Sequence, residues 1–93
     1  MNKPMRVHVL YSGHVQGIGF RFTARAIAHE LEITGWIKNR NDSRVEIIAE
    51  QQEEVLKQFL TRLQHSFSRY IQDVDVSWQP STGEFNGFTV EFI

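Results

Sequence analysis

Hydrophobic and polar residues alternate near the start of the chain and then change to a helical spacing. Val7, Val9 and Tyr11 share one face of an extended segment, which predicts a β-strand over residues 5–12. Further along, apolar residues recur at the spacing of one helix face, at Phe20, Ala24, Ile27, Ala28 and Leu31. We therefore expect a strand, a loop and then a helix over residues 20–32.

The middle of the chain has the pattern of a β-hairpin. Residues 33–40 and 44–50 are predicted strands, joined by the turn-forming run Asn41-Asp42-Ser43. In the later strand the residues alternate between two faces, one of which carries Val45, Ile47 and Ala49. We assign Trp36 to the core, because a large indole ring is most often buried.

The last third of the chain again has the pattern of a helix followed by strands. A helix is predicted over residues 52–66, with an apolar stripe at Val55, Leu56, Phe59, Leu60 and Leu63. Predicted strands follow over residues 71–79 and 85–92. No repeat, linker or low-complexity segment interrupts the pattern, so we expect residues 1–93 to form a single domain.

This order of elements predicts an α+β fold of the ferredoxin-like type. Such a fold is a split β-α-β sandwich, here βαββαβ with one further C-terminal strand. Right-handed crossover connections would place both helices on one face of a mainly antiparallel sheet.

The stretch between the first strand and the first helix is where we expect chemistry. It reads Gly13-His14-Val15-Gln16-Gly17-Ile18-Gly19-Phe20-Arg21. Glycines let amide groups crowd around a ligand, a helix start leaves N–H groups unpaired, and an arginine fork matches two phosphate oxygens. The stretch therefore predicts an anion cradle, although its spacing is neither that of a dinucleotide-binding fingerprint nor that of a Walker loop. As alternatives, the loop could be a plain connector and Arg21 a solvated helix residue.

Charge and composition narrow the classes of function. The formal net charge is −1, which gives no field to attract nucleic acid or an anionic membrane. The sequence has no cysteine, which excludes a disulfide framework, a thiolate nucleophile and a cysteine-type zinc site. Its 4 histidines lack metal-binding spacing, so we expect neither a metal nor a cofactor. No signal peptide or membrane span is apparent, and we expect a cytoplasmic monomer.

The glycine-rich stretch resembles the signature loop of the acylphosphatases, G-[R/K]-V-Q-G-V-G-F-R. Gly35-Trp36-Ile37-Lys38-Asn39 resembles their G-W-V-x-N element at the expected distance, and Phe85-Asn86-Gly87-Phe88 resembles their C-terminal F-x-G-F. The similarity covers nearly the whole chain, and ordered blocks at the right spacing are more specific than any one block.

The resemblance implies a fold, an activity and a set of residues. Members of the family have the ferredoxin-like fold and hydrolyse the carboxyl-phosphate bond of acyl phosphates, without a cofactor. By this resemblance Arg21 corresponds to the arginine that binds the phosphate and Asn39 to the asparagine that orients the attacking water. The phosphate-binding loop would comprise His14, Val15, Gln16, Gly17, Ile18, Gly19 and Phe20, and inorganic phosphate would be product and inhibitor.

The sequence departs from the family pattern at some positions. His14 replaces the usual Arg or Lys, which removes a permanent positive charge from the loop. Ser43-Arg44 stands where many members have Gly-Ser, so the turn is expected to differ or to be strained. Gln51 stands where a glycine often follows Ala-Glu.

Two other classes of function share this topology. An RNA-binding module would need basic and aromatic residues on the central strands, whereas the Gly-Ile-Gly-Phe-Arg-Phe run lies at a loop and a helix start. A non-catalytic domain that binds an anion or another ligand is the main alternative, because a fold does not fix a function. In that case Asn39 could simply begin the turn into Asn41-Asp42.

Overall fold

The computed structural model describes residues 3–92 and has the predicted order of elements. They are β1 (Pro4–Gly13), α1 (Phe20–Glu30), β2 (Thr34–Asn39), β3 (Val45–Gln52), α2 (Glu53–Phe67), β4 (Ile71–Pro80) and β5 (Phe88–Glu91). This is βαββαβ with a further C-terminal strand, so the ferredoxin-like α+β prediction is confirmed.

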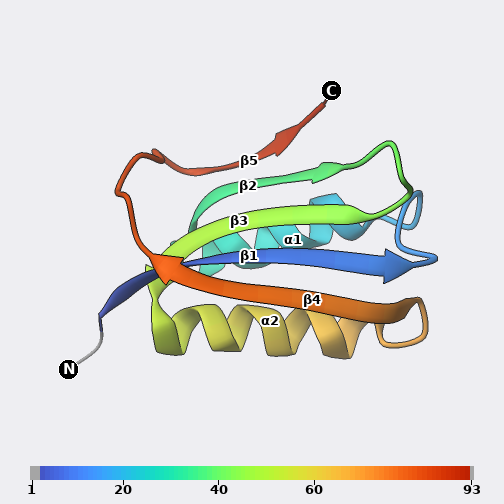
Figure 1. The fold of residues 1–93 in the computed structure, drawn as a ribbon, viewed down its shortest axis with the longest axis horizontal. Helices are drawn as coiled ribbons and strands as arrows, with labels where there is room; N and C mark the ends of the chain where they lie inside the picture. Colours follow the sequence, from blue (N-terminus) through green and yellow to red (C-terminus); the bar gives the residue numbers. More distant parts are fainter. Residues whose placement is uncertain (1–2, 93) are drawn as a thin grey trace.

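All the strands join one sheet in the order β4-β1-β3-β2-β5 (Figure 1). The pairs β1–β3, β1–β4 and β2–β3 are antiparallel, and β2–β5 is parallel. The prediction of a mainly antiparallel sheet is therefore confirmed. Helix α1 packs on β2 and β5, and α2 packs on β1 and β3, so the helices together cover one face of the sheet.

The core lies between that sheet face and the helices. The predicted alternation is confirmed, because Val7, Val9, Ile37, Val45 and Ile47 are all fully buried. The helices contribute Phe20, Ala24, Ile27 and Ala28 from α1 and Leu56, Phe59, Leu63 and Phe67 from α2. Burying one such large side chain stabilises the fold by about 1.5–3 kcal/mol.

Aromatic contacts connect this core to the start of α1. The ring of Phe20 lies 5.0 Å from that of Tyr11 on β1 and 4.5 Å from that of Phe67 on α2, measured between centroids. Ring pairs at this distance add stability beyond the area they bury. The first residue of α1 is thereby fixed to both layers, and with it the loop that precedes it.

The assignment of Trp36 to the core is wrong. Trp36 is only half-buried and lies on the sheet face that the helices leave open, with Lys38. The Lys38 ammonium lies 5.0 Å from the centre of the indole ring. The cause is the strict alternation of β2, in which Ile37 takes the buried position between these two residues.

Element boundaries differ from the predicted ones by a few residues. Helix α1 ends at Glu30, because Glu32 adopts a left-handed conformation with φ 57° and the Ile33 N–H donates back to the Ala28 carbonyl at 2.8 Å. The last strand is shorter than predicted, Phe88–Glu91. In the described part of the chain no helix is long and apolar enough to cross a membrane.

Candidate functional site

A pocket of about 250 Å³ lies where β1 ends, α1 begins and β2 ends. Its lining comes from the glycine-rich loop and the first turn of α1, joined by one residue from β2: Val15, Gly17, Gly19, Phe20, Arg21, Phe22 and Asn39. The fold thus brings the predicted catalytic residues Arg21 and Asn39 together in one pocket, from elements that are separate in the sequence.

From Val15 onward, the backbone N–H groups of this loop donate no hydrogen bonds within the described part of the chain. Among residues 3–92, no amide N–H from Val15 to Phe22 donates a hydrogen bond to a protein group. Gly17 and Gly19 have φ 78° and 82°, and left-handed residues at this spacing make a concave nest of N–H groups. The N-cap, Gly19, makes no side-chain cap, and the first turn of α1 has no acidic residue. The positive end of the helix is therefore unneutralised and suited to an anion.

Arg21 adds charged donors to the same pocket. Within the described chain its guanidinium makes no hydrogen bond and no ion pair. It is instead held by aromatic rings, with its central carbon 5.0 Å from the centre of the Phe92 ring and 5.9 Å from that of Phe22. Stacking on a ring face leaves the N–H groups in the guanidinium plane available for two phosphate oxygens.

Asn39, which lines the same pocket, carries an unpartnered oxygen. The Oδ1 atom is buried, and among residues 3–92 it is a buried side-chain polar atom without a hydrogen-bond partner. Leaving such an atom unpaired costs about 1–3 kcal/mol in a folded protein. Asn39 is the last residue of β2 and pairs with Val45, so its position is fixed by the sheet. A buried acceptor held at the wall of a pocket is suited to a bound water or ligand.

Gln16 ties the loop to the β2–β3 turn. Its side-chain amide donates to the carbonyl oxygens of Arg40 and Arg44, both at 2.9 Å. Gln16 is not among the lining residues, so its side chain holds the loop and Asn39 in register rather than facing the ligand. Sequence reasoning placed Gln16 in the loop but missed this bridge, because its partners lie 24 and 28 residues away.

The other predicted loop residues have different positions. Val15 and Phe20 are buried in the core, and Ile18 packs against it. His14 is exposed and does not line the pocket, and its backbone N–H donates to the Tyr70 carbonyl at 2.9 Å. The pocket therefore combines loop amides with the side chains of Arg21 and Asn39, whereas His14 lies outside it.

The charged residues of the β2–β3 turn pair with one another. Asp42 accepts hydrogen bonds from the side chains of Arg44 and Arg40, and these bonds, that of Arg44 above all, hold its pKa far below the ordinary range. Arg40 also reaches Glu46 at 3.3 Å. In contrast to Arg21, both of these arginines are neutralised locally. Ser43 in this turn has φ 74°, which is a left-handed conformation. A serine adopts this conformation only at a cost in energy, which agrees with the strain expected at that position.

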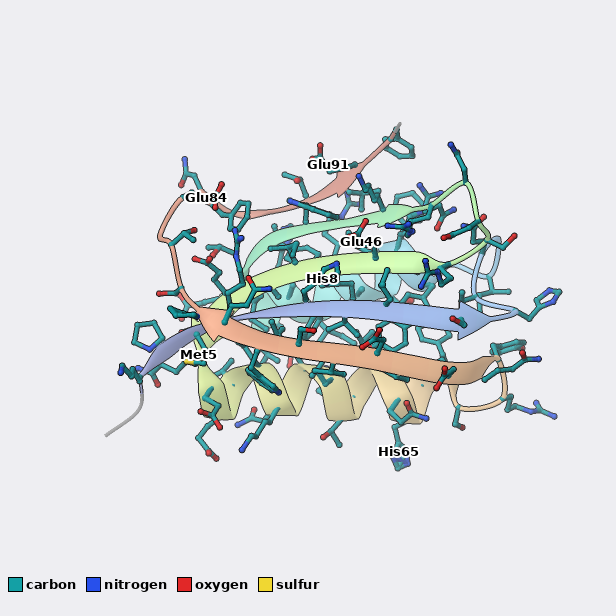
Figure 2. All side chains as sticks on the ribbon, viewed as in Figure 1. Met5, His8, Glu46, His65, Glu84 and Glu91 are labelled. Carbon is teal, nitrogen blue, oxygen red and sulfur yellow. The ribbon has the colours of Figure 1, made fainter. Side chains whose placement is uncertain are left out.

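Residues 3–92 contain no group of three or more His, Cys, Asp and Glu side chains that could hold a metal ion. His8 and Glu46 lie close together on neighbouring strands, 2.6 Å apart, whereas His65 projects from α2 on a different part of the molecule (Figure 2). Independence from metals remains a prediction.

A larger hollow of about 510 Å³ lies between α2 and β4. Its walls are Tyr11, Leu60, Thr61, Gln64, His65, Ser68, Val74 and Val76. Burial there raises the pKa of the Tyr11 hydroxyl well above its usual value, so this group stays protonated. This hollow has no arginine and no set of unpaired amides, so the smaller pocket is the better candidate for chemistry on an anion.

This chain is similar to known proteins in both sequence and fold. The family model described as Acylphosphatase matches residues 7–90. An acylphosphatase of Pelotomaculum thermopropionicum is 41% identical over 88 residues, covering 94% of this chain and 96% of its own, and one of Roseiflexus sp. is 37% identical over 86 residues, covering 91% and 92%. The crystal structure of acylphosphatase from Bacillus subtilis superposes with a TM-score of 0.87 at 32% identity, covering 95% of this chain and 99% of that one. By sequence and by fold alike, this chain belongs to the acylphosphatase family.

Proposed function

We propose that this protein hydrolyses acyl phosphates to a carboxylate and inorganic phosphate in the Arg21–Asn39 pocket. Family membership supports the reaction. The observation that carries the proposal for the site is the set of unpaired groups: loop amides, the Arg21 guanidinium and Asn39 Oδ1, none with a partner among residues 3–92. Several donors without protein partners, gathered around one pocket together with a buried unpaired acceptor, are suited to binding a ligand.

In this proposal the phosphoryl group is bound by donors alone. The amides of Val15 to Phe22 and the fork of Arg21 surround it, and the N-terminus of α1 adds its partial positive charge. Phosphoryl transfer requires mainly positioning and stabilisation of charge on the equatorial oxygens. Donors fixed by the fold supply both without reorganising during the reaction.

Asn39 has a separate role, which is to position the water. Its Oδ1 accepts a hydrogen bond from the water and so directs the water oxygen at phosphorus. An amide cannot take a proton, so Asn39 acts by orientation. As the new P–O bond forms, the bond between phosphorus and the acyl oxygen breaks and its electron pair leaves with the carboxylate. The proton of the water passes to a phosphate oxygen of the substrate.

The leaving group explains why the pocket needs no general acid. A carboxylate is a weak base and departs without protonation, whereas the alkoxide of a simple phosphate monoester does not. A residue that titrates near neutrality is accordingly not required, and among residues 3–92 the pocket lining includes no His, Cys, Asp or Glu side chain. We infer that monoesters are poor substrates for the same reason.

We further propose that residues 1–93 act as one catalytic domain, as a cytoplasmic monomer, with inorganic phosphate as a competitive inhibitor. One sheet and one core support the single domain. Analytical ultracentrifugation tests the monomer, and cell fractionation tests the location.

The proposal is tested by following benzoyl phosphate hydrolysis by the purified protein in EDTA, with 2-glycerophosphate, whose leaving group is an alkoxide, as the monoester control. We expect turnover of the acyl phosphate and almost none of the monoester. Phosphate binding without hydrolysis would instead identify a non-catalytic anion-binding domain. Loss of turnover on chelation would contradict the metal-free mechanism.

A further inference from the structure

We propose that the acyl group of the substrate lies against Phe22 and Phe92, so that the enzyme favours acyl phosphates with a flat, apolar acyl group. This inference rests on the proposed function, because it assigns the part of the substrate that the phosphate pocket does not hold. It makes Phe22 and Phe92 specificity-determining residues.

Both rings are exposed to an unusual degree. Phe22 is 50% and Phe92 72% exposed, although a phenylalanine side chain is among the most often buried in proteins. They come from distant parts of the chain, the first turn of α1 and the residue after β5, yet both contact the Arg21 guanidinium. An apolar surface placed around the mouth of a polar pocket is typical of a ligand-binding rim.

Cation–π contacts fix the orientation of the rings. Phe22 contacts two guanidinium groups, since the central carbon of Arg25 is 5.2 Å from its ring centre and that of Arg21 is 5.9 Å away. Phe92 lies 5.0 Å from Arg21. The rings are thus held in place on the protein side while much of their surface faces solvent. A prearranged apolar wall loses little conformational entropy when it binds a ligand.

The position of the rings relative to phosphate is set by covalent chemistry. In an acyl phosphate a single bridging oxygen joins phosphorus to the carbonyl carbon. With the phosphoryl group bound at Arg21, the acyl group must therefore leave the pocket within contact distance of the residues around Arg21. Phe22 itself lines the pocket and is half exposed, so its ring offers apolar surface beside the bound phosphoryl group.

A second hollow extends the apolar surface beyond Phe92. It has a volume of about 320 Å³ and is lined by Trp36, Lys38, Glu91 and Phe92. Figure 2 shows Glu91 on β5, near the C-terminal end of the described chain. The two charged residues have opposite signs, and Lys38 is placed over the Trp36 ring. This surface therefore offers aromatic contact without a net charge that would select an ionised acyl group.

The test compares benzoyl phosphate with acetyl phosphate, which carry the same reacting bond. The variants are Phe22→Ala, Phe92→Ala and the double substitution, with Trp78→Ala on β4 as the control. Trp78 is another exposed aromatic residue (39%), on the opposite edge of the sheet. Because each variant is compared with wild type on both substrates, the different intrinsic reactivities of the two substrates cancel.

We expect each single substitution to lower kcat/KM for benzoyl phosphate about fivefold more than for acetyl phosphate, and the double substitution about tenfold or more. The inhibition constant for inorganic phosphate should stay within about twofold of wild type, because the phosphate donors remain. Trp78→Ala should leave the substrate ratio unchanged.

Two results would overturn the inference in distinguishable ways. If the variants weaken phosphate inhibition and lower both substrates equally, the rings serve only to position Arg21. If the ratio in the double variant equals that of wild type, the acyl group binds elsewhere while the proposed function stands. Failure of wild type to hydrolyse either substrate would instead reject the proposed function itself.

Discussion

Arg6 and Arg21 have similar aromatic neighbours but opposite polar surroundings. Arg6 lies near the start of β1 and is 5.1 Å from the Phe85 ring centre, much as Arg21 is 5.0 Å from that of Phe92. Arg6, however, donates to Glu50 at 3.0 Å and to Glu84 at 2.6 Å. Arg21 has no carboxylate partner among residues 3–92. Arg6 lies near the start of β1, and the loop that leads to Arg21 follows the end of β1. Figure 1 shows that these two ends of β1 lie at opposite ends of the sheet.

The carboxylate beside Arg6 is saturated with hydrogen bonds. Glu50 is 5% exposed and accepts further bonds from the Thr82 N–H and hydroxyl and from the Gly83 N–H. Burial raises the pKa of Glu50, but these bonds together outweigh it, so the net pKa is lowered. The hydrogen-bonded groups around Arg6 therefore stabilise the fold, whereas the donors of Arg21 remain unpaired and can bind a ligand. In this molecule, the candidate active site differs from a purely structural cluster of charged residues because its polar groups lack partners within the protein.

The sharpest test of this contrast is Arg21→Lys. Charge is retained, but a point ammonium cannot donate a bidentate pair to phosphate, so kcat/KM should fall by about 10³-fold. Phosphate inhibition should weaken strongly, while the urea midpoint stays unchanged because no internal partner is lost. Steady-state kinetics and urea unfolding on one preparation measure all three quantities.

The matched variant is Arg6→Lys, for which we expect the reverse. It should lose about 1–2 kcal/mol of unfolding free energy, because bonds to Glu50 and Glu84 are weakened. Its folded fraction should keep the kcat of wild type. Wild-type kinetics in Arg21→Lys, or a catalytic defect in Arg6→Lys, would contradict the assignment of Arg21 to catalysis and Arg6 to stability.

Asn39→Ala should lower kcat by about 10²-fold with little change in KM, because phosphate binding does not depend on this residue. Unlike most polar deletions, it should not lower the urea midpoint, since the deleted Oδ1 has no partner to lose. Asn41→Ala in the adjacent turn is the control and should retain full kcat. A destabilised but fully active Asn39→Ala would assign Asn39 to the turn and remove it from the mechanism.

Glu50→Gln should cost about 2 kcal/mol at neutral pH, since an uncharged amide cannot accept all the donors that surround the carboxylate. The lowered pKa of Glu50 means that its contribution is fully present above the unfolded pKa of about 4.3 and is lost as pH falls through the folded pKa. The difference between wild type and Glu50→Gln should therefore shrink below about pH 4.3. Urea unfolding from pH 7 down to pH 3 measures it, and a constant difference across that range would contradict this role.

The smallest effect expected is from Ser43→Gly. The left-handed conformation costs a serine about 1–2 kcal/mol, and glycine loses about 0.5–1 kcal/mol more backbone entropy, so the net gain should be about 0.5 kcal/mol. Asn41→Gly, at a residue without positive φ, should be destabilising instead. Equal effects at both positions would show that the turn near the pocket stores no strain.

Alternation and helical spacing were enough to predict the sheet, the helices and most of the core. Patterns of period 2 and 3.6 report which residues face the interior, and this fold follows them closely. The loop was recognised as an anion cradle from its glycines, its helix start and Arg21. The partnership of Arg21 with Asn39 came from the resemblance, because no local pattern indicates which strand end meets which loop.

The features that escaped prediction depend on long-range contacts. Gln16 reaches the β2–β3 turn, and Arg6 reaches Glu50, 44 residues away. Phe92 meets Arg21 only because β5 pairs in parallel with β2 beside α1. Trp36 was misassigned because its size suggested burial, although its odd–even position on β2 placed it on the open face.

The sheet order also determines when the pocket can form as the chain folds. Strand β1 pairs with β3 and β4, so that Pro4 meets Gln52 and Met5 meets Pro80. Closing such distant pairs is slow, and proteins rich in them fold on the order of milliseconds to seconds. His14, which opens the loop, is held by the carbonyl of Tyr70. On a ribosome, the loop would therefore reach its final shape only after most of the chain has emerged, and recovery of activity on refolding should coincide with the slowest structural phase.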